Sequence, residues 1–183
     1  NGVDRYARLR RSATRENGEI ICRGSELWTL EQAERRGLAK EDSIERIIAQ
    51  VRSLGRDEVA EIGDLPAIVH RHWRELRTGS VVLTQPQREH MFERHQETKD
   101  LLLDVVLAVI DPDEIHPDKD FPDRVVFWRE IEGDATHWMR TVVVLDTTPP
   151  LQPSILTAWR TRQSEFRRQG RKVVPVWKRE ERI

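Results

Sequence analysis

The chain has a single cysteine, Cys22, and no long apolar segment. One cysteine cannot form an intrachain disulfide, and one thiol cannot build a zinc site by itself. Because no run of about 18 apolar residues occurs, the sequence predicts no membrane-spanning helix. The first residues contain no apolar signal-peptide core, so no signal peptide is expected. These absences favour a reducing compartment, and they are compatible with a fragment cut from a longer protein.

Several motifs with a known chemistry are also missing. The chain has no glycine-rich phosphate loop, no Gly-x-Ser-x-Gly turn and no His-Glu-x-x-His zinc motif. The acidic stretch from Asp111 to Asp123 lacks the glycine and the terminal glutamate of a calcium-binding EF-hand loop. We interpret this stretch as a solvated loop, and we expect neither a metal nor a cofactor.

Net charge gives no indication of a partner. The 183 residues include 31 Lys and Arg and 32 Asp and Glu, so the net charge is -1. Such a balance does not steer the protein towards nucleic acid or a membrane. The distribution is uneven, since Arg160–Arg182 is basic and Asp100–Asp123 is acidic. With 37% hydrophobic and 34% charged residues, we expect a modest core under a heavily charged surface.

Residues 1–78 show mainly helical patterns. Apolar residues from Ile44 to Val51 recur at the spacing of one helix face, and Gly55 ends the pattern. Two further helices are predicted over residues 29–37 and 64–79, the second with Asp64 as its N-cap.

From Ser80 onward, strands and helices are mixed. Strands are predicted over Val81–Leu83, Arg124–Ile131, Arg140–Leu145, Ser154–Trp159 and Val173–Trp177. Helices are predicted over Pro86–His95, Leu101–Ile110 and Thr161–Gln169. This order predicts an α+β fold, with a helical N-terminal region (1–78) of unknown role. A domain (79–183) follows, with helices packed on one face of a curved antiparallel sheet.

Histidine and arginine are concentrated in the segment Gln87–His95, which contains two of each. His90 and His95 are five residues apart and point about 140° apart on a helix, so they make a poor metal pair. Arg94 shares the helix face of His90. Because histidine titrates near neutral pH, we favour metal-free acid–base chemistry. The alternative is a solvated helix whose histidines have no catalytic role.

Thr157 and Trp159 belong to a predicted strand. By strand alternation they share one face with Ile155, while Leu156 and Ala158 occupy the other. A threonine hydroxyl beside a histidine can bind a scissile phosphate, and a tryptophan can stack on a base. The alternative is that both are ordinary strand residues.

Three arginines, Arg124, Arg129 and Arg140, begin or lie within predicted strands. A guanidinium aimed at a concave sheet face can stabilise negative charge on a phosphorane, whereas one that points to solvent cannot. The remaining histidines are expected in loops (His116, His137) or on the surface or an interface of the N-terminal region (His70, His72).

Residues 80–175 resemble the phage and polymorphic-toxin branch of the barnase–EndoU–colicin–RelE-like (BECR) ribonucleases. The resemblance rests on His-x-x-x-Arg-His at His90–His95, an apolar helix followed by Asp-Pro-Asp-Glu-Ile up to Ile115, aromatic-rich strands, and a strand that ends in Thr157-Ala158-Trp159. It implies a BECR-like fold and a metal-independent endoribonuclease toxin, with tRNA as the expected RNA.

In the chemistry that the resemblance implies, the ribose 2'-OH attacks the neighbouring phosphorus. His90 and His95 would be the base and the acid in either order, Arg140 would stabilise charge, and Thr157 would bind phosphate. Substrate contacts would come from Arg94, Arg124, Arg129, Trp159 and Arg160, with the following basic segment on the RNA backbone. The acidic residues Asp118, Asp120 and Asp123 depart from this pattern, because they oppose RNA binding near their loop.

A ribonuclease toxin that acts in the cytoplasm, delivered to a target cell as a toxin fragment, implies a cognate immunity protein or antitoxin. Two other functions stay open. The chain could be a non-catalytic module that binds nucleic acid or protein with the same sheet. It could also be a phage accessory or structural protein whose N-terminal helices form the functional interface.

Overall fold

The computed structural model describes residues 43–74, 76, 79–145 and 152–179, together with three short strands nearer the N-terminus. The chain divides into two compact units, Asn1–Arg46 and Ile47–Ile183. In the first unit, β1 (Arg15–Glu16), β2 (Glu19–Ile21) and β3 (Leu27–Thr29) form a small antiparallel sheet. Thr29, where a helix was expected to begin, is the last residue of β3, and the rest of that expected helix lies outside the described residues.

The second unit mixes helices and strands, and the predicted α+β class is confirmed. A helix over residues 43–53 contains the division between the units. It is followed by β4 (Val59–Asp64), α3 (Ala67–His72), β5 (Ser80–Thr84), α4 (Gln85–Arg94), the 3-10 helix η2 (Gln96–Lys99), α5 (Leu102–Ile110), β6 (Glu114–Pro117), β7 (Arg124–Glu130), β8 (His137–Val144), β9 (Ser154–Arg162), α6 (Gln163–Gly170) and β10 (Trp177–Lys178).

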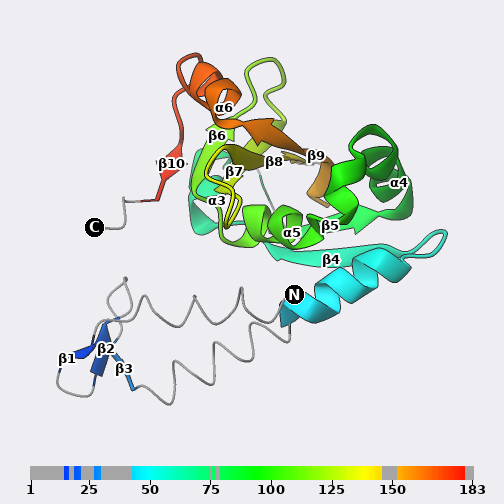
Figure 1. Cartoon of the computed structure of the whole chain (residues 1–183), viewed down its shortest axis with the longest axis horizontal. Helices are drawn as coiled ribbons and strands as arrows, with labels where there is room; N and C mark the ends of the chain where they lie inside the picture. Colours follow the sequence, from blue (N-terminus) through cyan, green and yellow to red (C-terminus); the bar gives the residue numbers. More distant parts are fainter. Residues whose placement is uncertain are drawn as a thin grey trace. The chain divides into compact units, whose positions relative to one another are not determined.

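Seven strands form one curled sheet in the order β10-β6-β7-β8-β9-β5-β4. All neighbours are antiparallel except β5 and β9, which run parallel and pair only where Val82 lies opposite Ser154. Helix α5 contacts β4, β7 and β8, so the sheet curls around this helix (Figure 1). Its sequence explains its place, because nearly every residue of Leu102–Ile110 is apolar and most are buried.

The two faces of the sheet carry separate apolar clusters, because successive strand residues point to opposite sides. On the first face, Val125 and Phe127 pack into the main core, which also includes residues of α3, α4, α5 and the preceding helix from Ile47 onward. Burial of a side chain as large as Phe127 stabilises the fold by roughly 1.5–3 kcal/mol. On the second face, Trp128 packs with Phe166 of α6 in a smaller cluster. Most helices therefore cover one face, as expected, and α6 covers part of the other.

Helix α4 is fixed at its start by Pro86, the residue that predicted it, and by a capping box that was not predicted from the sequence. Thr84 accepts a hydrogen bond from the Gln87 backbone, the Gln87 side chain accepts one from the Thr84 backbone, and Pro86 lies in the first turn. Such a capping box contributes about 1 kcal/mol. Because β9 leaves β5 after Ser154, α4 and η2 pack beside β9 instead, which brings His95 at the end of α4 to this strand.

The expectation of a helical N-terminal region is wrong at Val59–Asp64, which form strand β4 and pair with β5. Ala60 and Ile62 are buried and their neighbours are not, which is the two-residue period of a strand. Asp64 therefore ends a strand, and Pro66 precedes α3. The sheet thus crosses the expected boundary at residue 78, and the units divide at 46 and 47.

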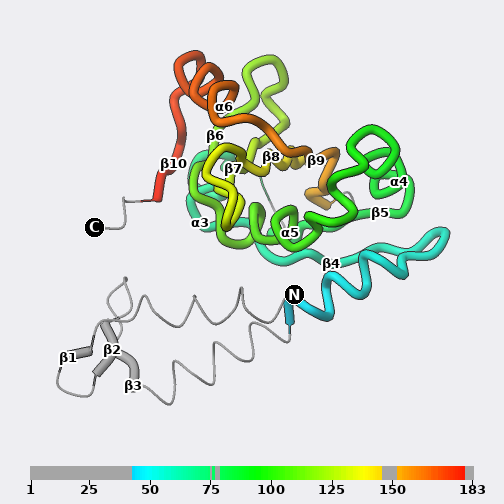
Figure 2. Tube along the Cα trace, viewed as in Figure 1, coloured from blue at the N-terminus to red at the C-terminus, as the bar shows by residue number. Residues whose placement is uncertain are grey.

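The C-terminal strand β10 pairs with β6 at the edge of the sheet (Figure 2). Of the strand expected over 173–177, only Trp177 is in β10. Arg179 fixes this end of the chain, because its Nη2 donates to the Asp111 carboxylate at 2.6 Å and to the Pro112 carbonyl at 2.7 Å.

Candidate functional site

The second face of the sheet gathers polar and aromatic side chains in two rows across the strands. Cross-strand partners share a face, so the register defines the rows. One row runs from β6 to β9 through Glu114, Trp128, Arg140 and Trp159, and the next runs through His116, Val126, Val142 and Thr157.

A bulge in β9 decides which residues join this face. Thr157 lies opposite Val142, but Ile155 lies opposite Val143, so Leu156 is an extra residue. Ile155 is therefore buried in the main core, and Leu156 packs on the second face instead. The prediction that Ile155 shares a face with Thr157 and Trp159 is wrong, because one inserted residue inverts strand alternation.

Arg140 lies at the centre of the site. Its guanidinium carbon is 4.3 Å from the centroid of the Trp159 ring and 5.6 Å from that of Trp128. Its Nη2 is 4.0 Å from Asp118 Oδ2, and its buried Nε has no hydrogen-bond partner among the described residues. Burial lowers the pKa of Arg140, while Asp118 and Glu165 act in the opposite direction. The group stays cationic at neutral pH, since a guanidinium gives up its proton only under strongly basic conditions.

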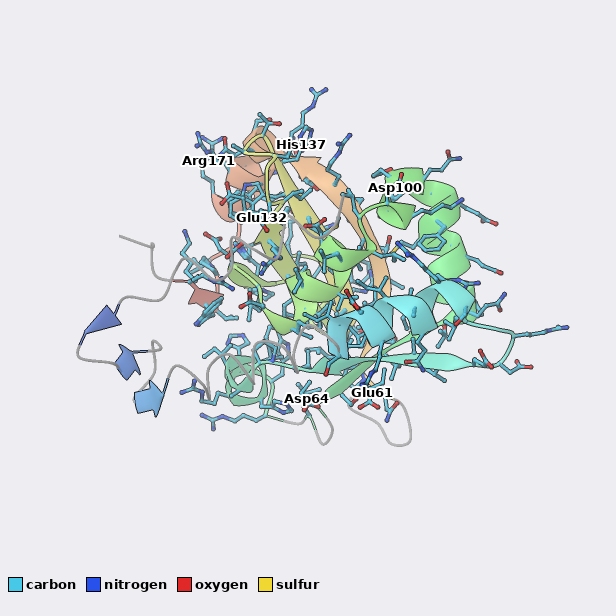
Figure 3. All side chains as sticks on the ribbon, turned by 60° about the horizontal axis from the view of Figure 1, so that its bottom comes forward. Glu61, Asp64, Asp100, Glu132, His137 and Arg171 are labelled. Carbon is cyan, nitrogen blue, oxygen red and sulfur yellow. The ribbon has the colours of Figure 1, made fainter. Side chains whose placement is uncertain are left out.

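His95 approaches the same tryptophan from α4. Its imidazole stacks on Trp159, with ring centroids 5.2 Å apart and ring planes 21° apart. Burial lowers the pKa of His95, Glu97 opposes this, and His90 and Arg94 lower it further. At neutral pH this imidazole is mainly neutral, so it can accept a proton. Figure 3 shows Asp100, just after η2, and Arg171, just after α6, on opposite sides of β9.

A pocket of about 230 Å³ lies on the other side of Arg140, between the sheet, the loop after β6 and α6. Figure 1 shows that loop beside α6. The buried His116 lines the pocket with its Nε2 2.7 Å from Glu114 Oε2, and Lys178 Nζ lies 2.7 Å from the other Glu114 oxygen. Burial alone would raise the pKa of Glu114, but the hydrogen bonds of His116 and Lys178 together lower it.

The charged residues that line the pocket have both signs. The cationic side chains are Lys119, Arg140, Arg168 and Lys172, and the carboxylates are Asp118, Asp120 and Glu165. Four cations against three carboxylates leave one positive charge, before any contribution from His116.

No family model, curated protein or solved structure matches the chain. In the part of the chain that the structure describes, no group of three or more His, Cys, Asp or Glu residues is placed to hold a metal ion. Within the same residues, no helix is long and apolar enough to cross a bilayer.

Several residues expected in the site are elsewhere. Arg129 lies on the first face, where its Nη1 donates to the backbone carbonyl and the carboxylate of Asp111. Arg160 is exposed and lies opposite Met139, which faces the main core, so Arg160 points away from Trp159. His90 and Arg94 are exposed on α4. These arginines and His90 do not converge on Arg140.

Arg124 does lie on the second face, since it belongs to the same side of β7 as Trp128. Arg124 lies outside the two rows, two residues before Val126 on β7. Its guanidinium carbon is 3.7 Å from the centroid of the exposed Phe121 ring. This contact occupies one face of the guanidinium, so Arg124 is a peripheral member of the site.

The sequence patterns failed to identify His116, which was expected in a loop. It lies in β6 and only 4% of its surface is exposed. The alternation of Glu114, Ile115 and His116 is a strand signal, but a strand that ends after four residues at Pro117 is too short for a pattern to define. His137, also expected in a loop, is the first residue of β8 and lies 2.9 Å from Asp134.

Proposed function

We propose that the chain is a metal-independent endoribonuclease of the toxin type, acting through the second face of the sheet. The observation that carries the proposal is the convergence of His95, Arg140 and Trp159, which come from three separate segments. The resemblance of residues 80–175 to the BECR ribonucleases supports the same chemistry. A toxin that cleaves tRNA in the cytoplasm of a target cell would require a cognate immunity protein or antitoxin.

In the proposed reaction the ribose 2'-OH attacks the adjacent phosphorus, and the bond from phosphorus to the 5'-oxygen breaks. The products are a 2',3'-cyclic phosphate and a 5'-hydroxyl. His95, neutral at neutral pH, takes the proton of the 2'-OH, and a water molecule protonates the leaving 5'-oxygen. Arg140, fixed between two indoles, stabilises the charge of the phosphorane because it needs no rearrangement during the reaction. The half-buried Thr157, one row from Arg140, offers its hydroxyl to a phosphate oxygen.

A second function, a non-catalytic binding module, is favoured by one observation. Asp118 lies 4.0 Å from Arg140, and it contributes a negative charge where RNA would bring another. A surface of this kind suits a protein partner with mixed charges better than a polyanion.

The test is incubation of RNA with the parent protein and two arginine variants in EDTA, followed on a gel. Arg140→Ala removes the central cation, and Arg160→Ala is the matched control on the other side of β9. We expect cleavage by the parent and by Arg160→Ala, and a rate at least about 100-fold lower for Arg140→Ala. Intact RNA with the folded parent, with or without divalent metal, would favour the binding module.

A further inference from the structure

The pocket beside Arg140 has room for a chemical group rather than for a whole ligand. Its volume is about 230 Å³, below the roughly 300–1,000 Å³ of typical small-molecule sites. Its residue His116 is in β6, three strands away from Trp159 in β9, on which His95 stacks. Neighbouring strands are about 4.8 Å apart, so His95 and His116 cannot act on the same phosphorus. The pocket is therefore placed to bind a chemical group beside the reaction centre.

The carboxylates of the pocket already have partners. Asp118 accepts hydrogen bonds from the backbone of Asp120 and Phe121 at 2.9 and 3.2 Å. Asp120 Oδ2 is 3.3 Å from Lys119 Nζ. Glu165 accepts hydrogen bonds from Arg168 at 2.8 Å and from Gln169 at 3.1 Å. Nearby cations thus offset the charges of Asp120 and Glu165, whereas Asp118 is held by backbone donors and lies 4.0 Å from Arg140.

The donors of the pocket are less well satisfied. Besides its contacts with the two indoles, Arg140 has a 4.0 Å ion pair with Asp118, and its buried Nε is unpartnered among the described residues. His116 is held by Glu114 on one nitrogen and is backed by Trp128, with ring centroids 6.4 Å apart. Lys172 lines the pocket and is exposed. A buried arginine left without a full set of acceptors beside a pocket favours an anion, because burial of the guanidinium strengthens the attraction.

We propose that this pocket binds the phosphate group that neighbours the scissile phosphate of the RNA, with Arg140 shared between the two phosphates. The inference rests on the proposed ribonuclease function and names a substrate requirement of the same site. His116, whose Nε2 is held by Glu114, donates to the phosphate from its other ring nitrogen when the imidazole is protonated. Lys172 contributes charge at the rim. The minimal substrate is therefore a dinucleotide with one further phosphate.

The experiment compares kinetics on a dinucleotide with those on the same dinucleotide carrying a 5'- or 3'-terminal phosphate. For the parent protein, a terminal phosphate at one of the two ends lowers KM about tenfold or more. Lys172→Ala and His116→Ala abolish this advantage and leave kcat within about twofold, because contacts equal in ground and transition states affect KM alone. His72→Ala, an exposed histidine on α3, is the matched control and retains the advantage.

A second measurement follows the histidine NMR signals of the parent protein during addition of inorganic phosphate. Saturable shifts of the His116 signal that weaken in Lys172→Ala support the pocket even if no RNA is cleaved, in which case the proposed function alone fails. Equal KM values with and without terminal phosphates, or an unmoved His116 signal, would overturn the phosphate subsite while leaving RNA cleavage intact. Because His116 is buried, only variants that melt like the parent enter the comparison.

Discussion

Arg140 and Trp159 lie directly opposite each other on β8 and β9, with the guanidinium carbon 4.3 Å from the centroid of the indole. A cation over a tryptophan face gains roughly 0.5–2 kcal/mol, more as water is excluded. The contact also fixes the direction of the guanidinium, and the imidazole of His95 stacks on the same indole. Trp159 thus contacts both side chains of the proposed reaction, His95 as the base and Arg140 as the cation that stabilises the phosphorane.

Removal of the Trp159 ring should therefore impair the reaction more than the fold. We expect Trp159→Ala to lower kcat about tenfold or more, because both Arg140 and His95 lose their contact. Trp159→Phe keeps an aromatic face and should stay within a few-fold of the parent. RNA cleavage rates and thermal melting check both variants together. Equal rates for the alanine and phenylalanine variants would show that the indole positions neither partner.

The imidazole of His95 should titrate below its ordinary pKa of 6.5, since burial is the largest cause of the shift. Between pH 6.5 and the lower folded value, the unfolded chain binds more protons than the folded one. Stability contributed through His95 is therefore complete above pH 6.5 and falls as the pH falls through this window. An NMR titration measures the midpoint, which Trp159→Ala should move towards 6.5. A midpoint at or above 6.5 in the parent contradicts the assignment of His95 as base.

Replacement of Thr141 by valine should stabilise the protein. Its side chain is fully buried, and its hydroxyl has no partner among the described residues. Replacement of an unsatisfied buried hydroxyl by a methyl group of similar shape removes a penalty of about 1 kcal/mol or more. Thr141→Val should raise the melting temperature by several degrees without affecting RNA cleavage. Thr157→Val, at a half-buried position on the second face, should bring no such gain but slower cleavage.

Arg129 should matter for stability alone. Its side chain is 13% exposed and is bound to Asp111 by its Nη1. Arg129→Ala removes a charge-assisted contact and leaves Asp111 with Arg179, so we expect a loss of about 1.5–3 kcal/mol. Denaturant unfolding measures the loss. The cleavage rate per folded molecule should not change. A large fall in that rate would show that Arg129 contributes to cleavage.

Asp134 should make the hairpin between β7 and β8 sensitive to acid. Hydrogen bonds from Thr136 and then His137 lower the pKa of Asp134 from 3.8 to about 2. A lowered carboxyl pKa contributes stability that is complete above the unfolded value and is lost as the pH falls towards the folded value. As the pH is lowered from 5 to 2, the thermal unfolding midpoint of the parent should therefore fall more steeply than that of Asp134→Asn. The same pH dependence in both proteins would contradict the hydrogen bonds of Asp134 with Thr136 and His137.

Much of the fold follows from strong local patterns. The apolar run of α5, the capping box of α4 and the β-branched strands β5 and β7 each have a signal that does not depend on distant residues. Strand β4 was missed because its six residues lie in a charged, helix-rich region, and its pairing with β5 decides its state. Tertiary pairing overrides local propensity in such short segments.

The site was predictable only in part. His95, Arg140, Thr157 and Trp159 were identified by residue type, and the structure brings them to one face. The bulge at Leu156, which sets that face, depends on the register with Val142 and has no signal in β9 itself. His116 and Glu114 were missed because their strand is four residues long, and their role depends on Arg140 two strands away.

The most direct measurement compares an RNA substrate with the same strand carrying a 2'-deoxyribose at the cleaved position, both in EDTA. If the proposed 2'-OH attack is correct, the RNA is cut to a 2',3'-cyclic phosphate and a 5'-hydroxyl, and the deoxy strand stays intact at that position. Cleavage of both strands, or an RNA product with a 5'-phosphate, would contradict attack by the 2'-OH and the roles assigned to His95 and Arg140.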